Sequence, residues 1–205
     1  MKSRLILRGN VPSAIRSDRD MCAVDPKAAD RAFQTQKKIL GAFLKEKGFV
    51  RYRTNSFIRR NEMDVLEYFD LQKESHGSKT MTANYALIPL YIPHSFLSFD
   101  LGDRLGMLIC GRDVWWDYAD DAAASVSFGN IMQAIEVYLL PWFAERSTVD
   151  SLKQALLHEE RKRKKWGGRL SDLQQKWLES CSGSPVDRDV IAETIKVLKL
   201  PANLC

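Results

Sequence analysis

Two long runs of strand-forming residues near the middle of the chain predict the centre of the fold. The runs are VLEYFDLQ at 65–72 and MTANYALIPLYI at 81–92, and a polar break at 73–79 separates them. Val65 and Phe69 share one face of the first run, while the second run is apolar on both faces, as expected of a strand covered on both sides. Neither run can bury an apolar face alone, so the pattern predicts a sheet with helices packed across it.

A helical repeat precedes the sheet and predicts a helix over residues 27–47. Asp25 and Pro26 suit its start, because an Asp side chain accepts from the unpaired N–H groups of the first turn and proline fits that turn. Gly48 suits a left-handed cap at its end. The repeating positions are Ala29, Phe33, Gln36, Leu40, Phe43 and Leu44.

Shorter segments on either side of the two runs complete the predicted sheet. FVRYR at 49–53 and SFIRR at 56–60 flank a tight turn, and residues 61–62 form the next turn. Residues 93–103 have the pattern of a loop. Residues 104–110 form either a last strand or a short helical turn, because their periodicity fits both.

A second helical repeat has the clearest periodicity in the chain. Its apolar stripe runs from Phe128 to Trp142, so we expect this helix to pack on the sheet. Ser125 or Ser127 is expected to cap its start. Pro141 either kinks the helix or begins a new turn, since proline removes an interior hydrogen bond.

Three further helices are predicted after residue 147, and the overall fold class is α+β. We expect an antiparallel sheet of four or five strands with an N-terminal helix and the following helices packed on it. Residues 1–24 are expected to form a flexible basic arm, 25–147 the α+β domain and 148–205 a helical C-terminal extension. The start signals of the last three helices are Ser147 with Asp150, Ser171 with Gln174, and Ser184 with Pro185.

The net charge of +5 is concentrated in two places. Residues 161–165 are five consecutive cations, and residues 1–19 hold five more against one Asp. No apolar run approaches the roughly 20 residues that cross a bilayer. The four cysteines lie far apart, which argues against a zinc module or a disulfide framework. These features favour a cytoplasmic protein without a membrane partner.

The segment around the paired tryptophans has two interpretations. Arg104, Arg112, Asp113, Trp115 and Trp116 are candidates for a surface that binds a partner protein, because Trp and Arg supply much of the binding energy at interfaces. In the structural alternative, one indole closes the core and the other covers a strand end, with Asp113 paired to an arginine such as Arg104.

The basic run also has two interpretations. Five cations at a helix end can contact the phosphates of a nucleic acid, or an acidic partner, without reading a base sequence. Alternatively the run is a solvated helix end, where cations interact favourably with the helix dipole and with the preceding Glu159 and Glu160. The residues of this candidate contact are Arg161, Lys162, Arg163, Lys164 and Lys165.

The sequence contains none of the catalytic motifs that identify common enzymes. The three histidines, His76, His94 and His158, lie far apart and show no metal-ligand spacing, and there is no GxSxG, P-loop or GxGxxG motif. Glu67 is expected to form a structural ion pair if it is buried. An enzyme would need Glu67, His76 or Arg104 to converge in one pocket. The sequence therefore favours a protein without catalytic activity, cofactor or metal.

Six short segments occur in the order found in a known family. They are Gly48-Phe49, FDLQKES at 69–75, MTAN at 81–84, RLGML at 104–108, Asp113 with Trp115 and Trp116, and residues 140–143. Over residues 30–146 the chain resembles the bacterial domain-of-unknown-function 4304 family. The resemblance implies a compact α+β domain with an antiparallel sheet and no established activity, and a role as an immunity or accessory protein to a toxin.

These observations predict a protein that acts by binding another macromolecule. The first hypothesis is a non-catalytic cytoplasmic protein whose partner is another protein, such as an immunity or inhibitor protein that binds a toxin. The alternative is nucleic-acid binding through residues 161–165 and the N-terminal arm.

Overall fold

The computed structural model describes residues 26–99, 101–183 and 187–204. The predicted arm at 1–24, the Asp25 cap and the Ser184-Pro185 helix start lie outside these residues. The elements are α1 Pro26–Glu46, β1 Val50–Arg51, β2 Ser56–Arg60, β3 Val65–Lys73, β4 Thr80–Pro89, β5 Leu101–Arg104, α2 Leu105–Cys110, β6 Trp116–Asp117, α3 Asp121–Ala134, a π-helical turn Ile135–Leu139, α4 Leu140–Ala144, α5 Val149–Lys165, α6 Asp172–Ser180, α7 Arg188–Leu198 and a 3₁₀ turn Ala202–Leu204.

All strand pairs in the sheet are antiparallel, which confirms the predicted α+β class. The strand order is β1-β2-β3-β4-β5, and the short β6 pairs with β4 beside the end of β5. The two long runs form β3 and β4, paired from Val65 opposite Pro89 to Lys73 opposite Met81. The two-residue β6 is the strand beyond the four or five expected from the sequence.

The register divides the sheet into two faces with different partners. Odd-numbered residues of β3 and β4, such as Phe69 opposite Tyr85, point toward α1 and α3, and this side is called the α1/α3 face. Even-numbered residues, such as Tyr68 opposite Ala86, point to the other side, called the α7 face. The prediction that β4 is covered on both sides is confirmed, because each face has its own buried cluster.

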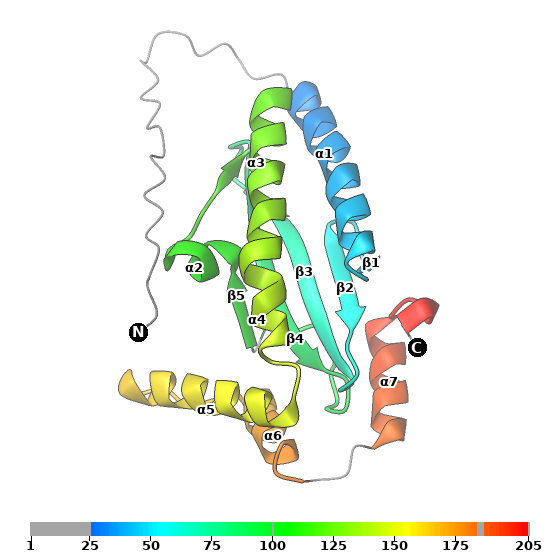
Figure 1. The fold of residues 1–205 in the computed structure, drawn as a ribbon, viewed down its shortest axis with the longest axis vertical. Helices are drawn as coiled ribbons and strands as arrows, with labels where there is room; N and C mark the ends of the chain where they lie inside the picture. Colours follow the sequence, from blue (N-terminus) through cyan, green and yellow to red (C-terminus); the bar gives the residue numbers. More distant parts are fainter. Residues whose placement is uncertain (1–25, 100, 184–186, 205) are drawn as a thin grey trace.

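Helix α1 and a long helical rod pack on the α1/α3 face (Figure 1). In Figure 1, α1 lies beside a long helical rod that runs from α3 through the π-helical turn into α4, and both cross in front of the sheet. Phe33 of α1 packs edge-on against Phe128 of α3, with ring centroids 5.6 Å apart. Fully buried residues of this core include Phe33, Leu40, Leu44, Phe69, Phe128, Ile131 and Phe143.

The predicted helix at 27–47 is confirmed as α1, one residue earlier at each end. Gly48 follows it with a φ of +84°, the left-handed conformation that glycine adopts most readily. Its N–H donates to the carbonyl oxygen of Lys45, and the N–H of Phe49 donates to that of Leu44. These bonds satisfy helix-end carbonyls and turn the chain into β1.

The cap of α3 differs from the prediction. Asp120 is the N-cap, and its carboxylate accepts a hydrogen bond of 2.8 Å from the N–H of Ala123. Ser127 instead donates its hydroxyl to the carbonyl oxygen of Asp117, and Ser125 is exposed. Pro141 lies in the first turn of α4, after the π-helical turn, so the predicted new turn is the alternative that the structure shows.

Residues 101–110 divide into a strand and a helix. Leu101–Arg104 form β5 on the free side of β4, so the prediction of a loop through residue 103 is wrong there. Leu105–Cys110 form α2. Arg104 is both the last residue of β5 and the N-cap of α2, which explains why the sequence pattern of this segment fitted both a strand and a helical turn.

The predicted helices after residue 147 are present, but two of their three caps differ from the prediction. Asp187 caps α7, so this helix begins at Arg188, later than the predicted start at Ser184 and Pro185. Thr148 and Ser151 form the capping box of α5, whereas the hydroxyl of Ser147 donates to the carbonyl oxygen of Ala144 at the end of α4. The predicted capping pair of Ser171 and Gln174 is confirmed for α6. None of the described helices is both long and apolar enough to span a membrane.

The C-terminal helices share buried surface with the sheet. Leu152 and Leu156 of α5 and Trp177 of α6 belong to the core of the α1/α3 face. On the opposite side, Ile191 and Leu198 of α7 pack into the cluster of the α7 face. That cluster also contains Ile58, Leu66, Tyr68, Ala86, Ile88 and Leu90.

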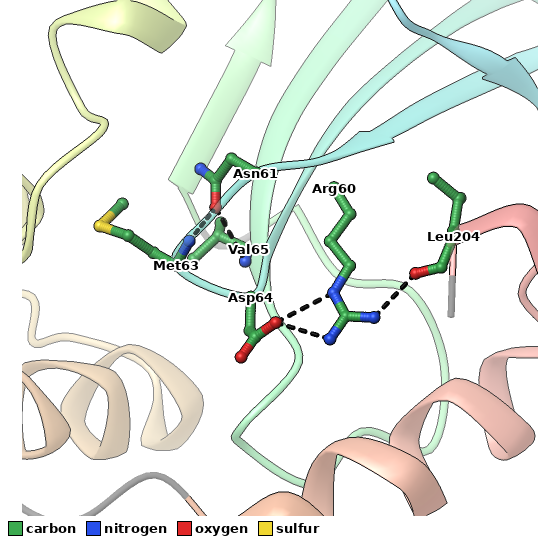
Figure 2. A network of polar contacts seen from close by, with 6 residues as sticks. All are labelled: Arg60, Asn61, Met63, Asp64, Val65 and Leu204. Atoms are coloured by element: carbon green, nitrogen blue, oxygen red, sulfur yellow. Dashed lines mark hydrogen bonds and ion pairs between the residues drawn. The ribbon is translucent and has the colours of Figure 1, made fainter.

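A polar network ties the end of the chain to the turn between β2 and β3 (Figure 2). The Asn61 side chain accepts hydrogen bonds from the N–H groups of Met63 and Val65, at 3.0 and 3.1 Å. Arg60 donates to Asp64 at 2.6 Å and to the carbonyl oxygen of Leu204 at 2.7 Å. The predicted turn at 61–62 is therefore also an anchor for the segment after α7.

Candidate recognition surface

The chain between β5 and β6 brings one arginine, one aspartate and one indole together. Arg104 ends β5, α2 follows, and a short loop then leads to Trp115 and β6. Gly106 permits this path, because a Cβ atom there would lie 2.5 Å from the N atom of Val114 and 2.6 Å from the carbonyl oxygen of Arg112. The loop backbone therefore packs directly against α2.

Gly111 supplies the reversal that returns the chain after α2. Its φ of +72° places it in the left-handed region, and its N–H donates to the carbonyl oxygen of Met107. Together Gly106 and Gly111 set the position of the loop that carries Asp113 and Trp115. Neither glycine was predicted to belong to the site, although a glycine at each end of the four-residue apolar segment 107–110 is a usable signal.

The guanidinium of Arg104 lies between the two other side chains. It forms an ion pair with the Asp113 carboxylate and lies over the Trp115 ring, 5.3 Å from the ring centroid. The predicted pairing of Asp113 with Arg104 is therefore present. Trp115 is 39% exposed, and Arg112 is exposed in the same loop. We call Arg104, Arg112, Asp113 and Trp115 the Arg104 surface.

Trp116 lies apart from this surface. It belongs to β6, pairs with Met81 of β4 and is buried in the core of the α1/α3 face, with 7% of its area exposed. Successive residues of a strand point to opposite sides. Trp116 therefore fits the structural interpretation, because it closes the core. Trp115 remains at the surface and stays a candidate for binding a partner.

A pocket of about 320 Å³ adjoins the Arg104 surface on β3, β4 and β5. Gly102 allows β5 to approach β4 closely beside it, because a Cβ atom there would collide with the carbonyl oxygen of Tyr85 and lie 2.7 Å from the Cα of Ala86. Asn84 donates a hydrogen bond of 3.2 Å to Gln72 across the strands. The pocket is lined by Gln72, Asn84, Phe99, Gly102, Asp103 and Arg104.

Asp70 lies beside this pocket and is poorly compensated. Burial raises its pKa to about 6, and only the hydrogen bond with Asn84 opposes that rise. Its Oδ1 atom is buried and has no hydrogen-bond partner among the described residues. The buried hydroxyl of Thr82, on the same face, also has none there. The α7 face is therefore polar at this end and apolar at the end that α7 covers.

The basic run lies where the sequence placed it, at the end of α5, and carboxylates already neutralise much of it. Glu159 pairs with Lys162 at 3.8 Å and with Arg163 at 3.0 Å. Glu160 pairs with Lys164 at 2.8 Å. Within the described chain, Arg161 and Lys165 form no ion pair.

Two cations of the run also line a pocket beside β5. Lys162 and Arg163 border this pocket of about 410 Å³ together with Arg146 and His158. Arg146 stacks on Trp142, with its guanidinium 4.2 Å from the ring centroid, and burial lowers its pKa. The run is therefore partly a wall of this pocket and only partly a solvated helix end.

The residues considered for catalysis do not meet. Glu67 lies on the α1/α3 face and accepts a hydrogen bond of 2.6 Å from Arg59, so the predicted structural ion pair is present. Arg104 lies on the opposite face, level with Asn84. His76 is exposed in the connection between β3 and β4, where its N–H donates to Glu74.

The acidic cluster before α3 is used in capping. Asp117 accepts from the N–H of Ala119 at 2.7 Å, and Asp120 caps the helix. Among the described residues, no three His, Cys, Asp or Glu side chains gather as a metal site would require.

Comparison with known proteins places the middle of the chain in a recognised family. A family model described as a domain of unknown function, DUF4304, matches residues 40–145. A search of curated proteins and a search of solved structures each found no match. The matched range contains α1 from Leu40, the whole sheet, the Arg104 surface and the helical rod through α4.

Proposed function

The chain belongs to the DUF4304 family, whose description states no activity, and we propose that it acts by binding another protein on the Arg104 surface without catalysing a reaction. The observation that carries this proposal is the Arg104 guanidinium held between Asp113 and the exposed ring of Trp115. Trp and Arg are the side chains that most often dominate binding energy when a partner covers them.

The arrangement lowers the entropy lost on binding. Arg104 is fixed at the end of β5, where its backbone N–H donates a hydrogen bond of 2.8 Å to the Asp103 side chain. Trp115 is fixed by the loop that Gly106 and Gly111 hold in place. A side chain that is already ordered loses little conformational freedom in a complex, so more of its contact energy appears as affinity.

The surface also indicates what the partner presents. Arg104 and Arg112 carry two positive charges against the single carboxylate of Asp113, so an acidic group of the partner is favoured beside an apolar group that covers the indole. An immunity or inhibitor protein acts in this manner, by occupying the surface of its target. This supports the proposal of a non-catalytic inhibitor without naming its target.

Affinity capture with matched tryptophan variants tests the proposal. The full chain is immobilised and exposed to native lysate, and the variants are Trp115→Ala, Arg104→Gln and the control Trp166→Ala. Trp166 is an indole that is 81% exposed and lies outside this loop, at the end of α5. We expect one stoichiometric protein partner to bind the wild type and Trp166→Ala and to be lost from the other two variants.

Two results would overturn the proposal. One is the absence of a stoichiometric protein partner for the wild type. The other is retention of that partner by Trp115→Ala and Arg104→Gln while circular dichroism shows both variants to be folded.

Nucleic-acid binding by the end of α5 is the second candidate, and a specific observation supports it. Arg161 and Lys165 form no ion pair within the described chain, and Trp166 beside them offers a ring on which a base can stack. We expect Arg161→Gln/Lys165→Gln to lower the magnitude of the salt slope of DNA binding by about 2, and the matched control Lys162→Gln/Lys164→Gln to lower it less. An equal slope in wild type and both double variants would remove this candidate.

A further inference from the structure

A groove of about 400 Å³ lies between α1 and the β1–β2 edge of the sheet, on the far side of β3 from the Arg104 surface. Its floor is apolar and includes Phe49 and Phe57, which are buried beneath it. Gly41 of α1 makes the hollow, because a Cβ atom there would already touch the Phe57 ring at 3.5 Å. The groove is lined by Lys37, Lys38, Gly41, Lys45, Phe49, Val50, Arg51, Thr54 and Phe57.

The charges around this groove all have one sign. Lys37, Lys38, Lys45 and Arg51 line it, and its lining contains no Asp or Glu. None of these four cations forms an ion pair within the described chain. The guanidinium of Arg51 donates only to two backbone carbonyl oxygens of the following turn, at 3.4 and 3.3 Å.

Lys37 is the most unusual of the four. Only 7% of it is exposed, and its ammonium group donates a hydrogen bond of 3.0 Å to the amide oxygen of Asn55. Burial lowers the pKa of Lys37, and the positive charges of Arg51 and Lys73 lower it further. A buried cation is ordinarily compensated by a carboxylate, and here a neutral amide stands in that position.

We propose that this groove binds an amphipathic anion, an acyl chain with a carboxylate head, with the chain on Phe49 and Phe57 and the carboxylate among the four cations. An apolar floor that buries the chain, with a few charged groups around it for the head, is the common composition of small-molecule sites. The volume is within the range of such sites. This site is separate from the protein-binding surface proposed above.

The N-terminal segment of the same chain is a poor alternative occupant because its charge has the wrong sign. Cations outnumber acids in residues 1–25, so this segment would be repelled by the groove. An anionic ligand instead removes the mutual repulsion of the four cations. Binding should therefore weaken as salt rises, since the rim cations Lys38, Lys45 and Arg51 are exposed.

Calorimetric titration of the full chain with decanoate, below its micelle concentration, tests the proposal. We expect one site, and we expect decyltrimethylammonium, which has the same tail and the opposite charge, to bind at least tenfold more weakly. Acetate, which has the head without the tail, should not bind measurably. Decyl phosphate tests whether the groove prefers a carboxylate head or any anionic head. If decyl phosphate binds more tightly than decanoate, the assignment of a carboxylate is overturned.

Two variants test the groove, each with a control. Gly41→Leu places a side chain in the hollow and should abolish decanoate binding, whereas Gly129→Leu, the same change at an exposed helical glycine with open space around it, should not. Lys38→Gln/Lys45→Gln/Arg51→Gln should weaken binding at least tenfold, whereas the corresponding triple change to Gln at Arg161, Lys164 and Lys165 should not. Absence of decanoate binding by the wild type, or unchanged binding by folded Gly41→Leu, would overturn the proposal.

Discussion

The two faces of the sheet are built from the same strands but differ in what they bury and expose. On the α1/α3 face, aromatic side chains of α1, α3 and the strands fill the space along β3 and β4. On the α7 face, α7 packs on the apolar end, and the other end carries Asp70, Gln72, Asn84 and Arg104. The α1/α3 face therefore holds the larger buried core, and the α7 face carries polar groups beside the Arg104 surface.

The strand period makes this division possible. A residue and its neighbour along a strand point to opposite faces. The side chains on one face can therefore change while the packing of the other face is kept. Tyr68 and Phe69 show the principle, because the first belongs to the α7 cluster and the second to the aromatic core. Variants at matched positions on the two faces should therefore differ in what they disturb.

The largest expected effect is on the α1/α3 face. Phe128→Ala removes a fully buried ring that packs against Phe33, so the free energy of unfolding should fall by about 4 kcal/mol. Ile131, one turn further along α3, is itself fully buried in the same core, so it is not free to move into the cavity.

Urea denaturation measures this change against a control on the same helix. Val126 of α3 is 65% exposed, so Val126→Ala should change the free energy of unfolding by no more than about 0.5 kcal/mol. Equal losses for Phe128→Ala and Val126→Ala would show that the core of this face does not carry the stability assigned to it.

A smaller loss of stability is expected on the α7 face. Leu198→Ala removes a side chain that is 2% exposed from a cluster with fewer members, so the free energy of unfolding should fall by about 3 kcal/mol. The neighbouring Val197 is 40% exposed, and Val197→Ala is the control. Hydrogen exchange should show α7 amides opening faster in Leu198→Ala while α1 amides are less affected, and equal acceleration of both would contradict the division between the faces.

At the polar end of the α7 face, a substitution should raise the free energy of unfolding instead of lowering it. The pKa of Asp70 is about 6 in the folded chain, above its unfolded value of about 3.9. The folded state therefore holds the proton more tightly, and stability falls as pH rises from about 4 to about 6. At pH 7 Asp70→Asn should raise the free energy of unfolding by about 2 kcal/mol, because it removes a charge that is costly to bury.

The pH dependence itself provides the control for Asp70. At a pH of about 3 the wild-type carboxyl is mostly protonated in both states, so wild type and Asp70→Asn should have nearly equal stability. Urea denaturation at both pH values measures the two differences. A variant that is less stable than wild type at pH 7 would show that the ionised Asp70 has a stabilising partner.

The sequence predicted β3, β4 and the first helix well because their signals are local, whereas it missed β5 and β6. Alternation places Val65 and Phe69 on one face, and Gly48 marks the end of α1, whatever the rest of the chain does. Other features depended on competition between neighbours. Asp120 caps α3 in place of the predicted serines, because the helix begins at Asp121 and both serines lie inside it.

The charged sites show why sequence proximity is a poor guide to a binding site. The five cations at the end of α5 are adjacent in sequence, yet Glu159 and Glu160 lie one helical turn earlier and neutralise part of them. Lys37 and Lys45 of α1 lie roughly two helical turns apart. Arg51 reaches them only because the chain folds back after α1 into β1, so the groove with four unneutralised cations was not predicted.

The smallest change of stability is expected at Trp115, and its neighbour makes the comparison direct. Trp115 is 39% exposed and Trp116 is 7% exposed, so the free energy of unfolding should fall by about 1 kcal/mol for Trp115→Ala and by about 3 kcal/mol for Trp116→Ala. Only Trp115→Ala should lose the protein partner at a temperature where both variants are folded. If the two substitutions cost the same stability, Trp115 would be a core residue, and the Arg104 surface would have no exposed indole to offer a partner.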